Sequence, residues 1–240
     1  MPSPNQADVL NTLLKALPND VFGRLSPCMR FVDLPLRHSL VDADKPTTEV
    51  CFIERGLGSI VASSSDDEFI EVGHIGREGM SGTHLLLKVD RTPTKTFMQV
   101  AGQGIMVPSA KFLAVLEEQP PTRDFFLRYV HCCELQLAHS ALANARYSVH
   151  ERLARWLLMS HDRLDGDDLP LTHEFLAIML GVRRSGVTDQ IHILEGSGAI
   201  KATRGKIHII SRPKLEDVAA GSYGVPELEY QRLIGRPIKS

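Results

Sequence analysis

Apolar side chains recur at helical spacing through the middle of the chain. Residues 122–145 contain neither proline nor glycine, which permits an unbroken helix of roughly 36 Å at 1.5 Å per residue. Its apolar positions alternate in steps of four and three, the heptad pattern of a two-stranded coiled coil. The pattern predicts a dimerisation helix whose seam consists of Phe126, Val130, Cys133 and Leu137. A second stripe of Leu135, Ala138 and Leu142 is expected to pack on the preceding domain. The alternative is a helix buried within one subunit.

The first half of the chain has a shorter period. Apolar or alternating runs of four or five residues fall between residues 31 and 107, with glycines between them. Such runs predict short antiparallel strands joined by glycine turns, as in a sandwich or barrel. The runs are 31–34, 50–53, 58–61, 69–72, 96–100 and 104–107, and the glycines are Gly56, Gly73, Gly76, Gly79 and Gly102.

Two short helical segments follow one another in the stretch from Leu171 to Ile210. Thr172 is a suitable N-cap for the first helix, and Gly181 can end it in a left-handed conformation. A second helix begins three residues later, with Val187, Ile191 and Leu194 as its apolar face. Two such helices joined by a glycine turn predict a helix-turn-helix.

A small hairpin completes this unit. Residues 199–202 and 206–210 alternate in hydrophobicity around the turn Arg204-Gly205, so the sequence predicts a winged helix. Arginine, glutamine, serine and threonine suit base edges and phosphates. The candidate DNA-binding residues are Thr172, Arg183, Arg184, Ser185, Thr188, Asp189 and Gln190, with Arg204 and Lys206 on the wing. The alternative is an ordinary helical hairpin with a solvated charged face.

The charge of the chain is divided unevenly. Its 240 residues carry a net charge of −2. Residues 1–118 hold 11 basic and 15 acidic side chains, whereas residues 171–215 hold 7 basic and 3 acidic side chains. A basic module beside an acidic domain is consistent with binding to double-stranded DNA. No apolar stretch is long enough for a signal peptide or a membrane span. The four cysteines show no disulfide framework, so we expect a cytoplasmic protein with reduced thiols.

Three stretches resemble the Crp/Fnr superfamily of bacterial transcription regulators: Ile75–Gly82, Val149–Leu158 and Phe175–Ile210. The resemblance implies an α+β protein with an antiparallel, jelly-roll-like β-roll (a double-stranded β-helix), a long dimerisation helix and a C-terminal winged helix-turn-helix. We assign a sensor domain to residues 1–118, the dimerisation helix to 119–146, the DNA-binding domain to 147–220 and a tail to 221–240. The resemblance also implies a homodimer on an inverted-repeat operator, with RNA polymerase as a partner.

The recognition helix departs from the family pattern. Arg184 matches the arginine that reads guanine in the family. Ser185 stands where the family has a glutamate, Asp189 where it has a second arginine, and Arg183 where it has a capping serine. We therefore expect the docking mode to be shared but the operator sequence to differ.

The expected effector pocket departs further. Family members that bind cyclic nucleotides place a Gly-Glu pair after the glycine turn and an Arg-Ser pair on a later strand. Here Thr83 follows Gly82, and neither Arg91-Thr92 nor Lys95-Thr96 is the usual pair. The pocket candidates are Gly79, Gly82, Thr83, Arg91, Lys95 and Thr96. We expect an unknown small-molecule effector rather than cyclic AMP, and no resident cofactor.

Other chemistries have weaker signals. The iron–sulfur branch of the family needs an N-terminal cysteine cluster, and only Cys28 and Cys51 precede residue 119. His131, Cys132, Cys133 and His139 suggest a metal site without a recognised spacing, and His38, His74, His84 and Pro2 suggest a haem site. No catalytic motif indicates an enzyme. A rival function is a small-molecule or cyclic-nucleotide binding module that controls a protein partner, with the helix-turn-helix as scaffold.

Overall fold

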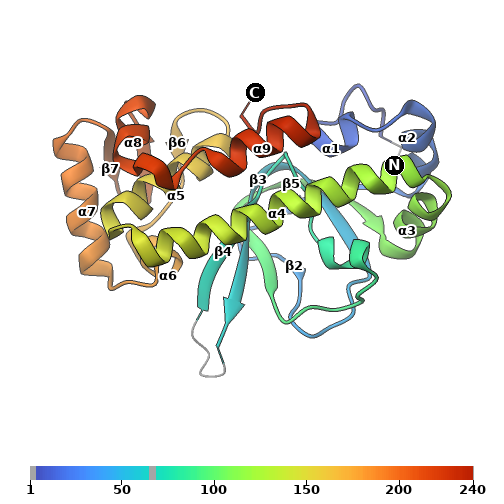
Figure 1. The fold of residues 1–240 in the computed structure, drawn as a ribbon, viewed down its shortest axis with the longest axis horizontal. Helices are drawn as coiled ribbons and strands as arrows, with labels where there is room; N and C mark the ends of the chain where they lie inside the picture. Colours follow the sequence, from blue (N-terminus) through green and yellow to red (C-terminus); the bar gives the residue numbers. More distant parts are fainter. Residues whose placement is uncertain (1–3, 65–68, 240) are drawn as a thin grey trace.

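A single long helix joins the two halves of the fold. The computed structural model describes residues 4–64 and 69–239. Figure 1 shows helix α4 (Pro120–Arg146) running along most of the molecule, with the sheet against one part of it and the C-terminal helices around its other end. Two short helices, α1 (Thr12–Lys15) and α2 (Asn19–Leu25), and the 3-10 turn η1 (Ser26–Cys28) precede the sheet.

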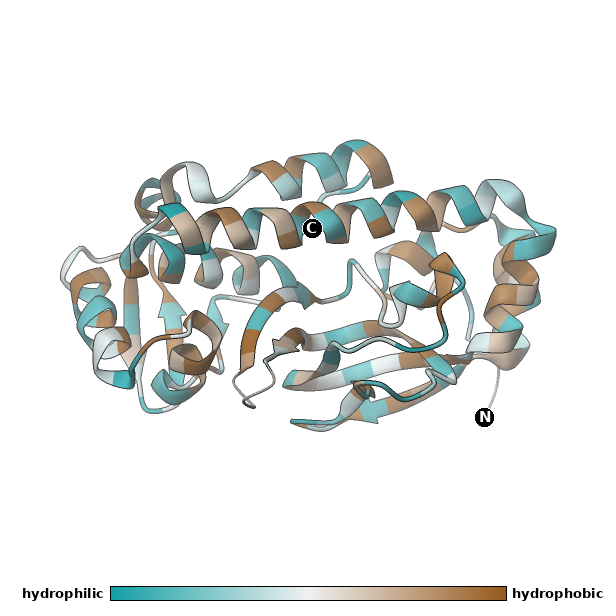
Figure 2. Ribbon diagram, turned by 60° about the horizontal axis from the view of Figure 1, so that its bottom comes forward, coloured by the Kyte–Doolittle hydropathy of each residue, from teal (hydrophilic) through white to brown (hydrophobic). Residues whose placement is uncertain are grey.

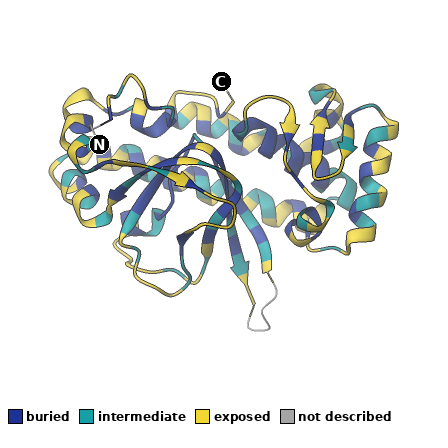
Figure 3. Cartoon of the chain, turned by 180° about the vertical axis from the view of Figure 1, so that it is seen from behind, coloured by how far each residue is buried: buried dark blue, intermediate teal, exposed yellow. Residues whose placement is uncertain are grey.

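The N-terminal domain is an antiparallel β-roll, as predicted. Its strands follow the order β1-β5-β3-β4, and β2 pairs with β5. Figure 3 shows buried residues filling the inside of the roll. The strands are β1 (Arg30–Leu34), β2 (Ser39–Val41), β3 (Glu49–Ser63), β4 (Phe69–Ile75) and β5 (Lys95–Pro108), with η2 (Thr83–Leu87) before the last.

Three predicted glycine turns lie inside strands instead: Gly73 within β4, and Gly56 and Gly102 at bends in two long strands. Gly56 lies within β3 and Gly102 within β5, where the register between the strands shifts around Arg55. The backbones approach so closely there that a Cβ on Gly102 would lie 1.9 Å from the carbonyl oxygen of Arg55. Gly56 has a φ of +92°. Glycine thus permits a sharp bend without ending either strand.

One face of helix α4 was predicted to meet a second copy of the chain. In the structure this face packs against the core of its own chain. After α3 (Ser109–Glu118), the ring of Phe126 packs edge-on against Phe52 and Phe112, with centroids 6.1 and 5.1 Å away. Phe126 is 0% exposed and Val130 is 7% exposed, both in the main core. A second copy cannot reach them. Phe126 and Val130 of the predicted seam therefore belong to the core of their own chain, whereas Cys133 is half-buried and Leu137 is 40% exposed.

The opposite face of α4 is open. Leu142 is 42% exposed, Ala138 is exposed and Leu135 is half-buried. These three residues were expected to pack on the β-roll, and the structure instead leaves them as an apolar stripe at heptad steps. Figure 2 shows apolar and polar positions alternating along this helix. We call Leu135, Ala138 and Leu142 the outer stripe.

The C-terminal domain is the predicted winged helix-turn-helix. A capping box between Ser148 and Glu151 starts its first helix. Its apolar residues form a second core, which also includes Val61 of β3. The elements are α5 (Val149–Arg163), β6 (Asp168–Leu169), α6 (His173–Leu180), α7 (Arg184–Gly196), β7 (Ile200–Thr203), β8 (Lys206–Ile209), α8 (Arg212–Ala219), η3 (Ala220–Ser222) and α9 (Val225–Ile234).

Buried polar contacts join the two domains. The Nε atom of Arg163 donates to Glu78 Oε1 at 2.7 Å, and both side chains are at most 3% exposed. The indole of Trp156 donates to Glu71 Oε1 at 2.9 Å. Tyr230 of α9 donates to the carbonyl oxygen of Glu78 at 2.7 Å. The winged-helix half is therefore anchored to β4 and to the turn that follows it.

We predict that Gly102→Ala destabilises the protein by roughly 1–3 kcal/mol, because the new methyl group collides with backbone rather than with a movable side chain. Urea unfolding measures the change. Gly23→Ala is the control: nothing lies within 4 Å of its new Cβ, and alanine in a helix gains up to about 1 kcal/mol. A Gly102→Ala variant as stable as the wild type would contradict the close strand crossing.

Candidate nucleic-acid interface

The local sequence sets the orientation of α7. The Thr172 hydroxyl accepts the backbone N–H of Phe175 at 3.1 Å and so caps α6. Gly181 ends that helix with a φ of +62°. The apolar face of α7, formed by Val187, Ile191 and Leu194, is fully buried. The opposite face of α7 therefore points to solvent.

Two free arginines stand at the start of α7. Arg183 occupies the N-cap position without a side-chain capping bond, and Arg184 is the first helical residue. Both are exposed, and within residues 4–64 and 69–239 neither guanidinium has a hydrogen-bond or ion-pair partner. Ser185 and Asp189 lie on the same exposed side. Unpaired guanidinium groups beside a helix N-terminus favour an anionic ligand.

Other predicted residues of α7 are less accessible. Thr188 is half-buried, and its hydroxyl donates to the carbonyl oxygen of Arg184 at 3.1 Å. The same hydroxyl lies 3.1 Å from His173 Nδ1. Gln190 is also half-buried. These two residues are less available for base contacts than Arg184, Ser185 and Asp189.

The wing presents one free and one paired cation. Arg204 is exposed at the turn between β7 and β8, and the described residues offer its side chain no partner. The Nζ atom of Lys206 donates to Asp168 at 2.9 Å, and His208 Nδ1 lies 2.8 Å from the same carboxylate. These hydrogen bonds lower the pKa of Asp168. Asp168 therefore neutralises part of the charge that Lys206 could offer to a phosphate.

An open groove of about 790 Å³ connects α6, α7 and the wing. Two histidines that the sequence analysis missed lie in it, His173 and His192. Burial, followed by the charges of Arg184 and His192, lowers the pKa of His173. His192 follows Ser185 and Asp189 at helical spacing, and this spacing was the available signal. The groove is lined by Thr172, His173, Glu174, Arg184, Ile191, His192, Glu195, Ala202, Thr203, Arg204 and Gly205.

The expected effector-pocket residues lie in differing environments. A Cβ on Gly79 would be 2.1 Å from the Tyr129 hydroxyl, so α4 fills the space beside this glycine. Gly82 precedes η2 with a φ of +77°, and Thr83 begins that turn. Arg91 pairs with Asp90 at 3.2 Å. The remaining two candidates differ in exposure: Lys95 is exposed and lies 5.9 Å from the centroid of Phe97, whereas Thr96 is 5% exposed.

The metal and haem hypotheses gain no support. Among the described residues, no group of three or more His, Cys, Asp or Glu side chains is arranged to hold a metal ion. Burial raises the pKa of Cys132 to about 11 and that of Cys133 to about 12. Pro2 lies outside the described residues. Within the same described ranges, no helix has the length and apolar character to cross a membrane.

Comparisons with known proteins agree with this geometry. Residues 151–218 match the family model of the Crp-like helix-turn-helix domain. A search of curated proteins finds no match. Residues 151–218 thus form a Crp-like helix-turn-helix domain, in agreement with the resemblance seen in this part of the sequence.

The similarity in fold extends over most of the chain. A transcriptional regulator of the Crp/Fnr family from Eubacterium rectale has a TM-score of 0.68 at 16% identity, covering 86% of this chain and 97% of that one. FixK2 from Bradyrhizobium japonicum has a TM-score of 0.68 at 14% identity, covering 80% of this chain and 98% of that one. The c-di-GMP-responsive regulator CLP from Xanthomonas campestris has a TM-score of 0.65 at 16% identity, covering 81% of this chain and 100% of that one. The chain therefore has the fold of Crp/Fnr regulators.

We predict that a disulfide reagent such as dithionitrobenzoate labels Cys28 rapidly and the other three thiols slowly at pH 8. Burial raises the pKa of Cys51 to about 12, so little thiolate forms there, and Cys132 and Cys133 are similarly protected. Cys28 and Cys133 are both half-buried as residues, but burial of its thiol group raises the pKa of Cys133, which keeps this thiol protonated at pH 8. Cys28→Ser should abolish the fast phase. If two or more thiols per chain reacted in the fast phase in the folded wild type, at least one buried cysteine would be open to redox chemistry.

Proposed function

We propose that this protein is a cytoplasmic, homodimeric transcription regulator that binds an inverted-repeat operator and acts with RNA polymerase. One observation carries the proposal: two arginines without a side-chain partner among the described residues, Arg184 and Arg204, line a single groove between α7 and the wing, and the unpaired Arg183 directly precedes α7. In winged-helix docking, α7 enters the major groove and the wing contacts the backbone. Arg184 is the guanine-reading residue, and Arg204 is the main phosphate contact of the wing.

The outer stripe of α4 supports the homodimer. Leu135, Ala138 and Leu142 repeat at heptad steps on the face that the β-roll leaves open. Two such helices packed together bury Leu142 against its own copy. A two-fold dimer places two α7 helices on half-sites about one DNA turn apart, roughly 34–36 Å.

The effector is not cyclic AMP. A cyclic nucleotide needs a buried acceptor for its ribose hydroxyl and a planar cation for its phosphate. Thr83 is the residue after Gly82 and is a short, weak acceptor. Lys95 is an exposed point charge, and Arg91 is engaged by Asp90. The absence of both contacts weakens binding by about a hundredfold or more.

Salt dependence separates the regulator from the rival function. A small-molecule module with a helix-turn-helix scaffold gains nothing from phosphates. A DNA-binding regulator releases counterions, so its affinity for duplex DNA falls steeply as salt rises. Selection of operators from random DNA then tests the dimer, because recovery of asymmetric half-sites would contradict two-fold binding.

We predict that Arg184→Ala weakens specific binding by roughly 1–3 kcal/mol and relaxes preference at one base pair. Arg204→Ala should weaken binding to all DNA sequences alike. It should also reduce the slope of log affinity against log salt concentration (the salt slope) by about one unit. Lys206→Ala should have the smaller effect of the two wing changes, because Asp168 already holds this lysine. Fluorescence anisotropy at several salt concentrations measures all three.

The matched control is Arg30→Ala, an exposed arginine of the β-roll that pairs with Glu49. Its affinity and salt slope should equal those of the wild type. Cyclic AMP at millimolar concentration should change none of these values. Wild-type affinity and slope in both Arg184→Ala and Arg204→Ala would place the DNA face elsewhere.

We predict that Leu142→Glu dissociates the dimer, because each copy would bury a carboxylate against its partner. Leu137→Glu is the matched control: Leu137 is 40% exposed against 42% for Leu142, but it lies ~140° away around the helix. Light scattering should find Leu137→Glu dimeric and Leu142→Glu monomeric. Retention of the dimer in Leu142→Glu, or its loss in Leu137→Glu alone, would reject the outer stripe as the interface.

A further inference from the structure

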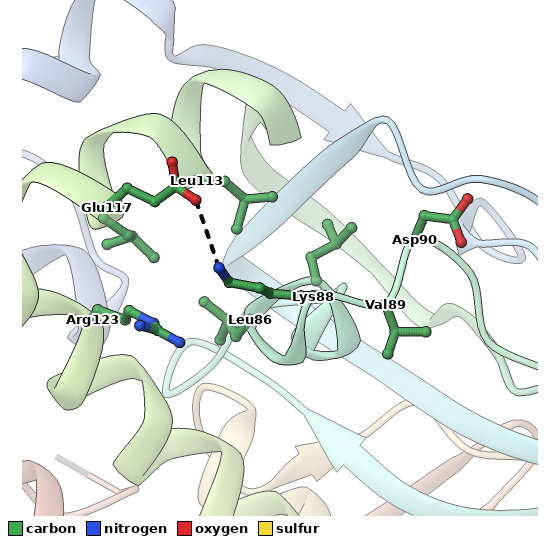
Figure 4. A pocket seen from close by; sticks show the side chains of 9 residues that line it. Leu86, Lys88, Val89, Asp90, Leu113, Glu117 and Arg123 are labelled. Atoms are coloured by element: carbon green, nitrogen blue, oxygen red, sulfur yellow. Dashed lines mark ion pairs between the residues drawn. The ribbon is translucent and has the colours of Figure 1, made fainter.

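A pocket separate from the glycine turn opens between η2, α3 and the first turn of α4. Its volume is about 210 Å³, below the 300–1,000 Å³ typical of sites for drug-sized ligands, so it suits a small molecule. Figure 4 shows the side chains that line it. They are Leu85, Leu86, Lys88, Val89, Asp90, Leu113, Leu116, Glu117 and Arg123.

The floor of the pocket is apolar. Leu85, Leu86 and Leu116 are at most 5% exposed and belong to the main core. Leu113 is half-buried beside them, and Val89 is 48% exposed. The floor therefore accepts a hydrocarbon or aromatic body and holds it against a rigid surface.

The charged residues at the rim leave one cation in excess. Lys88 lies 4.0 Å from Glu117, and Arg91 neutralises Asp90 at 3.2 Å. Arg123 has no side-chain partner among the described residues. Figure 4 shows its guanidinium directed toward Leu86, with Asp90 at the other end of the pocket. A planar, unpaired guanidinium above apolar walls matches a carboxylate with an apolar body.

We propose that this pocket binds a small organic carboxylate, with its apolar body on the leucine floor and its carboxylate on Arg123. The site is distinct from the expected cyclic-nucleotide residues at Gly82, Thr83 and Thr96. It also touches the start of α4, the helix that carries the outer stripe. Its existence does not depend on whether the protein binds DNA.

Octanoate is the probe, and octanamide is its uncharged counterpart with the same apolar body. Isothermal calorimetry on the full chain should give a Kd between roughly 10 µM and 1 mM for octanoate, the range of a ligand this small. Octanamide should bind at least about tenfold more weakly, as expected when a charge-assisted hydrogen bond is lost. Arg123→Gln should weaken the binding of octanoate by a similar factor and leave the binding of octanamide unchanged.

Arg128→Gln is the matched control, since this exposed arginine lies further along α4 and does not line the pocket. It should bind octanoate as the wild type does. Leu113→Trp, which fills the pocket, should abolish binding of both probes. No octanoate binding up to about 10 mM, or equal binding by Arg123→Gln and the wild type, would overturn the proposal.

Discussion

A buried ion pair between Glu78 and Arg163 fixes how the DNA-binding half sits on the β-roll. Burial alone would lower the pKa of Arg163, but the adjacent carboxylate of Glu78 raises it, so the guanidinium stays charged. Glu78 also accepts the backbone N–H of Gly76 at 3.0 Å. Removing one partner would leave an uncompensated charge, at a cost of about 3–5 kcal/mol. The turn after β4 and helix α5 are therefore held as one unit.

The contacts of α4 with the β-roll and with α9 determine which face of α4 stays exposed. Tyr129 accepts the Met80 backbone N–H at 3.1 Å, and Gln136 accepts that of His74 at 2.6 Å, so two polar side chains fix the rotation of α4 on the roll. Tyr230 of α9 closes a second side by its bond to Glu78. The outer stripe lies on the side of α4 that these contacts leave exposed.

Local signals in the sequence predicted the winged helix well. The cap at Thr172, the left-handed Gly181 and the Arg204-Gly205 turn each act within a few residues, and the structure contains all three. The orientation of α4 depended on distant residues instead. Its two faces are both apolar at heptad spacing, so periodicity cannot tell which one meets Phe52 and Phe112. The bends at Gly56 and Gly102 likewise depend on a neighbouring strand, and the partner of Glu78 lies 85 residues away.

The polar face of α7 also restricts the operator. Asp189 is exposed on the same helix as Arg184, and a carboxylate near phosphates is repelled unless it reaches a donor on a base. The cytosine amino group is the donor in the major groove that a carboxylate reads best, whereas Arg184 reads the acceptors of guanine. Both side chains therefore favour G·C pairs, Arg184 through the guanine and Asp189 through the cytosine. Ser185 accepts either base, so the docking proposed here places its discrimination at the positions read by Arg184 and Asp189.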